Sequence, residues 1–235
     1  MAIDDLPLPV VNFLNAIGVE WPYINEDQLM EFATLVREFS TAVGTTHQDA
    51  TTALATIGRA YQSAASETML NGWKRLSATY VTEILDGCAV LADALDGAAG
   101  YIVAQKVEAI ATLIGMAAAF VADQAAAAVT FGIAEAAVPL IVEGAEKLVD
   151  SLIMDLEQYI IGEVMEAAAK PLFAKIEAAL TGLDWSKSGA NPVESTGFEL
   201  DAPTTRAQAL LLRQHAATMR QHAATFAAGV QGLNF

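Results

Sequence analysis

The sequence predicts an all-α protein, an elongated bundle of long antiparallel helices with an alanine-rich helical hairpin at its centre. Apolar residues make up 54% of the chain, and many of them are alanine, the strongest helix former. No proline occurs between Pro22 and Pro139, which suits long uninterrupted helices. Apolar residues recur at seven-residue intervals in two segments, 29–60 and 209–233. This spacing is typical of helices that pack lengthwise.

The first long helix is expected to follow a short lead-in, residues 1–24, that ends in an aromatic turn after Gly18. Asn25 is a suitable N-cap residue, and the acidic Glu26 and Asp27 that follow it favour the positive end of a helix. Two apolar rows then predict a packed seam. The first row contains Leu29, Val36, Val43, Ala50 and Ile57, and the second contains Phe32, Phe39, Ala53 and Ala60, with polar Thr46 as an exception. A second helix is expected from about Trp73 to Leu95.

Residues 101–183 are the most apolar part of the chain. Between Ala109 and Ala122 there are only apolar residues, glycine and one threonine. This run is shorter than the roughly 20 residues that span a bilayer, so it predicts a buried central helix or helical hairpin. A break is expected at Val138-Pro139, and amphipathic spacing continues from there to Leu180.

The closing part of the chain is predicted to be a linker followed by one more helix. We expect one domain overall, with a long-helix bundle over 1–183, a linker loop over 184–203 and a closing heptad helix over 204–235 that packs back on the bundle. That helix starts near Pro203, and His215 and His222 are expected to flank its seam. The predicted seam has two rows, Ala209, Ala216, Ala223 and Val230 in one and Leu212, Met219, Phe226 and Leu233 in the other.

Charge and cysteine content exclude several classes of function. The chain has 12 basic and 28 acidic residues and a net charge of −16, which argues against a nucleic-acid partner because such a surface needs a basic patch. A single cysteine, Cys88, rules out an intrachain disulfide and is expected to be a buried thiol. The N-terminus lacks the basic and apolar regions of a Sec signal peptide. We therefore expect a cytoplasmic protein, or one exported by a route that reads a folded helical signal.

Motifs for catalysis, metals and cofactors are missing from the sequence. His215 and His222 lie about 10.5 Å apart along a helix at 1.5 Å per residue, which is too far to chelate one metal ion. There is no glycine-rich phosphate loop, no Cys-x-x-Cys and no Gly-x-Ser-x-Gly. We expect no catalytic residues, no metal site and no cofactor, and hence no enzyme.

The N-terminal motifs resemble a known family. Asp5-Leu6-Pro7, then Phe13-Leu-Asn-Ala-Ile-Gly-Val-Glu-Trp-Pro22 and Asn25-Glu-Asp-Gln-Leu29, are similar to the start of the WXG100-like N-terminal domain of actinobacterial polymorphic toxins and channel proteins linked to type VII secretion. The likeness covers nearly the whole chain. It implies an all-α fold whose partners are small WXG100-type helical proteins or the secretion machinery.

The resemblance also points to site residues. Tyr61-Gln62-Ser63 stands where the family has its Trp-x-Gly turn, and Trp73 is the downstream aromatic residue, so Tyr61, Ser63 and Trp73 form the candidate partner-binding turn together with the flanks of the 25–60 helix. The export signal of this system has the form Tyr-x-x-x-Asp/Glu on a helix. Tyr159–Glu163 and Tyr23–Asp27 both match it.

Three functions follow as hypotheses. The first is a secretion-targeting, partner-binding N-terminal module of a type VII-secreted toxin-like protein, which is exported without a Sec signal peptide and acts by helical recognition. The second is a membrane-active, pore-forming module that uses the apolar stretch 109–142. The third is a structural oligomer of this chain that associates through the heptad seams. The sequence leaves open whether a toxin domain follows Phe235.

Overall fold

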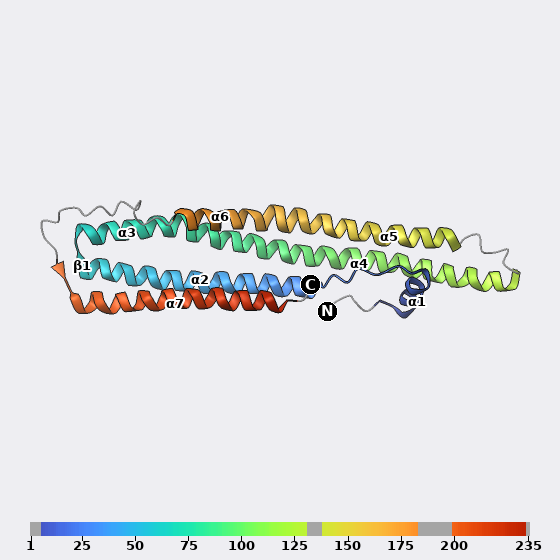
Figure 1. Cartoon of the computed structure of the whole chain (residues 1–235), viewed down its shortest axis with the longest axis horizontal. Helices are drawn as coiled ribbons and strands as arrows, with labels where there is room; N and C mark the ends of the chain where they lie inside the picture. The colour runs from blue at the N-terminus through green and yellow to red at the C-terminus, as the bar shows by residue number, and fades with distance from the viewer. Residues whose placement is uncertain (1–5, 131–137, 183–198, 234–235) are drawn as a thin grey trace. The chain divides into compact units, whose positions relative to one another are not determined.

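The described residues confirm the all-α prediction. The structure is a computed structural model that describes residues 6–130, 138–182 and 199–233, and within these ranges almost every residue is helical (Figure 1). The elements are α1 (Leu8–Ile17), α2 (Glu26–Ala60), β1 (Tyr61–Gln62), α3 (Ala64–Leu76), the π-helical turn η1 (Ser77–Val81), α4 (Thr82–Thr130), α5 (Val138–Tyr159), the π-helix η2 (Ile160–Ala169), α6 (Lys170–Gly182), β2 (Glu199–Leu200) and α7 (Ala202–Gly232).

The chain divides into two compact units. Unit 1 combines the residues up to Glu31 with Ala94–Met165, and unit 2 combines Phe32–Asp93 with Glu166–Leu233. Helices α2 and α4 therefore each contribute one segment to both units. The linker predicted over 184–203 lies mostly outside the described residues, as does Trp185.

Unit 1 contains the predicted helical hairpin. The rings of Tyr101 in α4 and Tyr159 in α5 are stacked with centroids 4.1 Å apart and planes at 9°. Further along, a Cβ on Gly144 would lie 3.5 Å from the end of Met116. As the residue number rises in α4 it falls in α5, so the two helices are antiparallel.

The described part of the lead-in, residues 6–24, belongs to the same unit. Gly18 ends α1 with φ +76, a left-handed conformation that glycine adopts without strain. Phe13 of α1 lies against Phe120 of α4 with ring centroids 5.3 Å apart, and Trp21 is buried. Asn25 caps α2 as predicted, because its Oδ1 accepts hydrogen bonds from the backbone N–H groups of Asp27 at 3.1 Å and Gln28 at 3.3 Å.

A buried ion pair fastens the lead-in and the start of α2 to α4. The Nζ atom of Lys106 lies 3.0 Å from Oε2 of Glu26, and both side chains are at most 1% exposed. The same ammonium also donates to the backbone carbonyl of Ile24. A buried charge is tolerated only when it is paired and hydrogen-bonded, so these contacts fix the position of the first turn of α2.

Unit 2 contains most of the predicted seam of α2. Within this unit the first row is buried at Val36, Ala50 and Ile57 and half-buried at Val43. In the second row, Phe39 lies 4.9 Å from Phe226 of α7 between ring centroids. The polar exception, Thr46, shares a 3.0 Å hydrogen bond with Nε2 of His222. The heptad pattern of α2 therefore predicted its packed face correctly.

A glycine allows the close approach of α7 to α2. A Cβ on Gly229 would come within 2.8 Å of a methyl group of Leu35, which is closer than two carbon atoms can pack without displacement. Glycine at this position lets the last turns of α7 lie against α2.

One of the two rows predicted to face inward on α7 is wrong. Ala209, Ala216 and Ala223 are exposed, so the alanine row is not part of the seam. The other predicted row is half-buried as expected, and so is Val230 at the end of the alanine row; the half-buried members of the predicted row are Leu212, Met219, Phe226 and Leu233. In place of the alanines, the half-buried residues beside this row are Gln208, His215, His222 and Gly229. The histidines therefore lie in the contact and do not flank it. At one position the reason is clear, because His222 gives the buried hydroxyl of Thr46 a hydrogen-bond partner that an alanine could not supply.

Two further expectations are corrected. The helix after the turn begins at Ala64 and not near Trp73, because Ser63 and Ser66 form a reciprocal capping box. Helix α4 runs on to Thr130 and does not end near Leu95. Of the two alternatives for the apolar middle, the hairpin is observed, and α4 is buried along one face only, at Ala109, Leu113 and Ala117. Val107, Ile114 and Val121 are 52%, 45% and 66% exposed. Cys88 is buried as predicted, and burial raises the pKa of its thiol.

We predict that Lys106→Met destabilises the protein by about 3–5 kcal/mol, because it removes the ammonium that pairs with the buried carboxylate of Glu26. Urea denaturation followed by far-UV circular dichroism measures this loss. The control is Lys147→Met, which removes an exposed ion pair to Glu143 and is expected to cost less than about 1 kcal/mol. Equal losses in the two variants would contradict the structural role of the Lys106 pair.

Candidate functional site

The candidate partner-binding turn reverses the chain between α2 and α3. Tyr61 and Gln62 pair as β1 with Leu200 and Glu199 of β2, and the N–H of Asp201 donates to the carbonyl of Ala60 at 2.7 Å. Ser63 Oγ then accepts the N–H of Ser66 at 3.1 Å, and Ser66 Oγ accepts the N–H of Ser63 at 3.1 Å. Tyr61 and Ser63 thus serve to close the turn, and both are half-buried.

Trp73 lies further along α3 and is held against α2. Its Nε1 donates to Thr51 Oγ1 at 2.9 Å, and its ring stacks on His47 with centroids 5.0 Å apart and planes at 19°. His47 Nε2 shares a 2.6 Å hydrogen bond with Ser77 Oγ at the start of η1. The structure therefore places Trp73 about three helical turns from the reversal, where its ring and its N–H both contact residues of unit 2.

The histidine of this cluster, His47, has a pKa below its ordinary value. Burial lowers the pKa of His47 because the charged imidazolium is poorly solvated there. A serine hydrogen-bonded to a histidine forms two of the three members of a nucleophilic triad. The described contacts of His47, however, are Ser77 and the ring of Trp73, and they include no carboxylate to orient the imidazole. The cluster is therefore better explained as a packing contact between α2, α3 and η1. It was not predicted, because 30 residues separate His47 from Ser77 along the chain.

The two matches to the export signal differ in structure. Tyr23 is 71% exposed and precedes α2, so the Tyr23–Asp27 match does not lie on one helix. Tyr159 is the last residue of α5 and Glu163 lies in η2, so this match is fully helical. Tyr159 is half-buried by its stack on Tyr101, whereas Glu163 is exposed.

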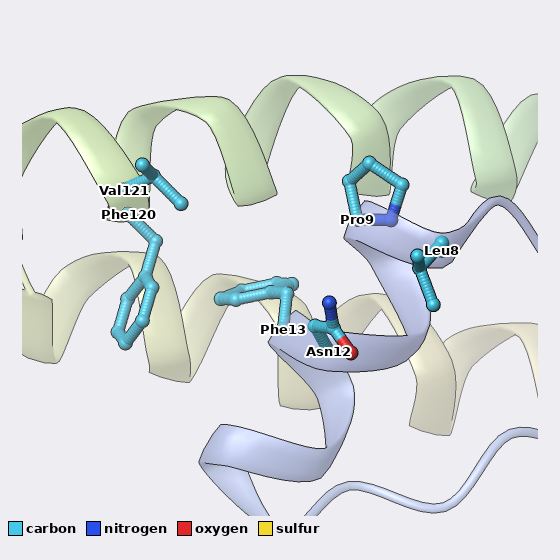
Figure 2. A pocket seen from close by; sticks show the side chains of 6 residues that line it. All are labelled: Leu8, Pro9, Asn12, Phe13, Phe120 and Val121. Carbon is cyan, nitrogen blue, oxygen red and sulfur yellow. The ribbon is translucent and has the colours of Figure 1, made fainter.

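An exposed apolar face on α4 was foreseen only in part, as a section of the membrane-active stretch 109–142, and not as a surface for a partner helix. Val107, Ile114 and Val121 are spaced by seven residues, and exposed Ala104, Ala111 and Ala118 alternate with them. The face ends in a groove of about 320 Å³ between α1 and α4. Figure 2 shows the side chains of α1 and α4 that line it: Leu8, Pro9, Asn12, Phe13, Phe120 and Val121. The signal that could have revealed this face is its seven-residue spacing.

Within residues 6–130, 138–182 and 199–233, no group of three or more histidine, cysteine, aspartate or glutamate side chains is arranged to hold a metal ion. The same residues include one helical segment, Thr82–Ala125, that is long and apolar enough to cross a membrane, with a mean hydropathy of 1.5. Only 28% of its most apolar window is buried, in line with the exposed face on α4.

Comparison with known proteins gives one match. A family model described as a WXG100 like domain matches residues 4–143, which include the turn at Tyr61, Trp73 and the exposed face of α4. No curated protein and no solved structure matches the chain.

We predict that acid destabilises unit 2 through His47. Because its pKa is lowered on folding, the unfolded chain binds the proton first, so stability is present above the ordinary pKa of 6.5 and is lost as the pH falls below it. The urea midpoint of the wild type should fall between pH 7.5 and pH 5.5, and His47→Gln should remove part of that fall. An unchanged pH dependence in His47→Gln would show that burial of this imidazole does not couple to folding.

Proposed function

Because the chain belongs to the WXG100-like domain family, a family of helical proteins related to type VII secretion, we propose that it is a secretion-targeting module that binds helical protein partners. It acts by recognition and not by catalysis. The observation that supports this function most directly is the exposed apolar face of α4, which lies inside the matched residues 4–143.

The face of α4 has the pattern that a partner helix needs. Large residues at 107, 114 and 121 alternate with alanines at 104, 111 and 118, so the face offers both knobs and shallow holes to a second helix. Alanine allows close approach of the two backbones. Soluble chains seldom expose a continuous apolar stripe without a use for it. Small WXG100-type helical proteins or a helix of the secretion machinery are the proposed partners.

The turn at Tyr61, Ser63 and Trp73 has a supporting role in this proposal. Its side chains make contacts inside unit 2 and hold α3 against α2. The proposed partner contact therefore moves from the turn itself to the apolar face of α4.

We further propose that the chain is exported without a Sec signal peptide, as the N-terminal module of an actinobacterial, toxin-like protein. Tyr159–Glu163 is the better candidate for the export signal, since it lies on a continuous helical stretch with Glu163 exposed. Tyr23–Asp27 is the weaker candidate because Glu26, between its ends, is buried against Lys106.

We predict that Ile114→Glu weakens partner binding at least about tenfold, because it places a charge in the middle of the apolar contact. The test is co-expression with a small WXG100-type protein encoded beside this one, followed by gel filtration and titration calorimetry. Phe173→Glu is the matched control, since Phe173 is 62% exposed and belongs to α6. Consistent elution of the wild type without any such partner would exclude the proposed binding.

We predict that Tyr159→Phe combined with Glu163→Gln reduces the secreted fraction of the protein several-fold in a host with a type VII system. Phenylalanine preserves the stack on Tyr101, so the fold is retained while both polar groups of the motif are lost. The control is Tyr23→Phe combined with Asp27→Asn. Immunoblots of culture medium and cell lysate measure export, and equal secretion of all three proteins would remove Tyr159–Glu163 as the signal.

A second candidate function is membrane insertion. The apolar helix Thr82–Ala125 and its exposed face motivate it, and part of the proposed hairpin 109–142 lies outside the described residues. A net charge of −16 opposes binding to anionic lipid at neutral pH. Dye release from anionic liposomes at pH 5 and pH 7 decides between the two functions, because a partner-binding module causes no leakage at either pH.

A further inference from the structure

Helix α7 carries a row of arginines on its outward face. Arg206, Arg213 and Arg220 are spaced by seven residues, and all three are exposed. Leu210 and Ala217 lie between them on the same face, and Leu210 is 57% exposed. The helix contains no aspartate or glutamate, although the chain as a whole has a net charge of −16. This face is thus a local basic surface on a strongly acidic protein.

Helix α5 carries acidic residues with the same spacing. Glu143, Asp150 and Glu157 are separated by seven residues and are exposed. Lys147 and Met154 lie between them, and Met154 is 54% exposed. The inward face of α5 is formed by Ala145, Val149, Leu152 and Leu156, which are buried in unit 1. The acidic row therefore points away from the core of its own unit.

We propose that α7 of one copy of this chain docks on α5 of a second copy. Three charges of one sign lie at seven-residue intervals on α7 and three of the other sign lie at the same intervals on α5. Each row extends about 21 Å along its helix at 1.5 Å per residue. Two helices in contact can then bring all three pairs together at once. Complementary charges flanking helical seams set partner choice and orientation in this way.

The residues between the charges indicate an antiparallel contact. In that direction Arg206 meets Glu157, Arg213 meets Asp150 and Arg220 meets Glu143. Leu210 then lies beside Met154, so two exposed apolar side chains cover each other. In the parallel direction Leu210 would face the ammonium of Lys147. The antiparallel contact therefore buries apolar surface that the parallel one leaves against a charge.

A second copy fits this surface on grounds of charge. A −16 chain repels its own copies over most of its surface, and the arginine row of α7 supplies the opposite sign that an approaching copy needs. Glu143 is already paired with Lys147 at 2.6 Å, so the pairs at Asp150 and Glu157 are expected to contribute most. Apart from Glu143, the residues of this contact lie outside the family-matched range 4–143, and the self-association is independent of the proposed export function.

Sedimentation equilibrium of the full chain over about 1–200 μM tests the proposal. We expect the wild type to self-associate, with a dissociation constant that rises about tenfold between 50 mM and 500 mM NaCl as the charges are screened. Arg213→Glu should raise the dissociation constant about tenfold at low salt. Asp150→Arg alone should do the same, and the double variant should recover the affinity of the wild type.

The terminal pairs test the direction of the contact. The loss caused by Arg206→Glu should be restored by Glu157→Arg and not by Glu143→Arg. Arg75→Glu is the control for net charge, because Arg75 is an exposed arginine of α3, and it should leave the dissociation constant within about twofold. Thermal melts verify that each variant is folded. A wild type that stays monomeric at 200 μM, or a double variant that is not restored, would overturn the proposal.

Discussion

The ion pair between Lys106 and Glu26 constrains much of unit 1. Residues 80 positions apart in the sequence are brought together with both side chains withdrawn from water, and the ammonium also holds the carbonyl of Ile24. Apolar contacts alone would permit several alignments of α1 and α2 along α4. The buried ammonium of Lys106 favours the one alignment that brings Glu26 within hydrogen-bond distance. The placement of α1 and of the first turn of α2 follows from this contact. The groove between α1 and α4 depends on the same placement.

Polar residues also decide how the helices of unit 2 are aligned. Thr46 interrupts the apolar rows of α2, and His222 of α7 supplies its hydrogen-bond partner. Trp73 joins α3 to α2 through a hydrogen bond to Thr51 and a stacked contact with His47. A shift of one helical turn would separate the buried hydroxyl of Thr46 from His222 and the half-buried Trp73 from Thr51, so both contacts favour the observed register. The apolar residues supply the area of the contacts, and the polar residues select among the alignments.

The surfaces proposed for function are those that this packing leaves uncovered. Within the described residues, the apolar face of α4 and the charged faces of α5 and α7 point outward from units whose inner faces are already packed. Two kinds of recognition are therefore available to the chain. An apolar seam suits a partner helix that stays bound, whereas rows of charge suit an association that responds to salt.

The sequence by itself determined the helical class, the cap at Asn25, the end of α1 at Gly18 and the start of α7 near Pro203, because these depend on neighbouring residues. The candidate site was predicted less completely: the turn residues and the Tyr159 motif remain predictions, and the face of α4 was expected to be buried. Only the tertiary structure decided which row of α7 packs, since alanine and histidine rows have the same seven-residue period. It also decided that Lys106 is buried, because that depends on Glu26, which lies 80 residues away.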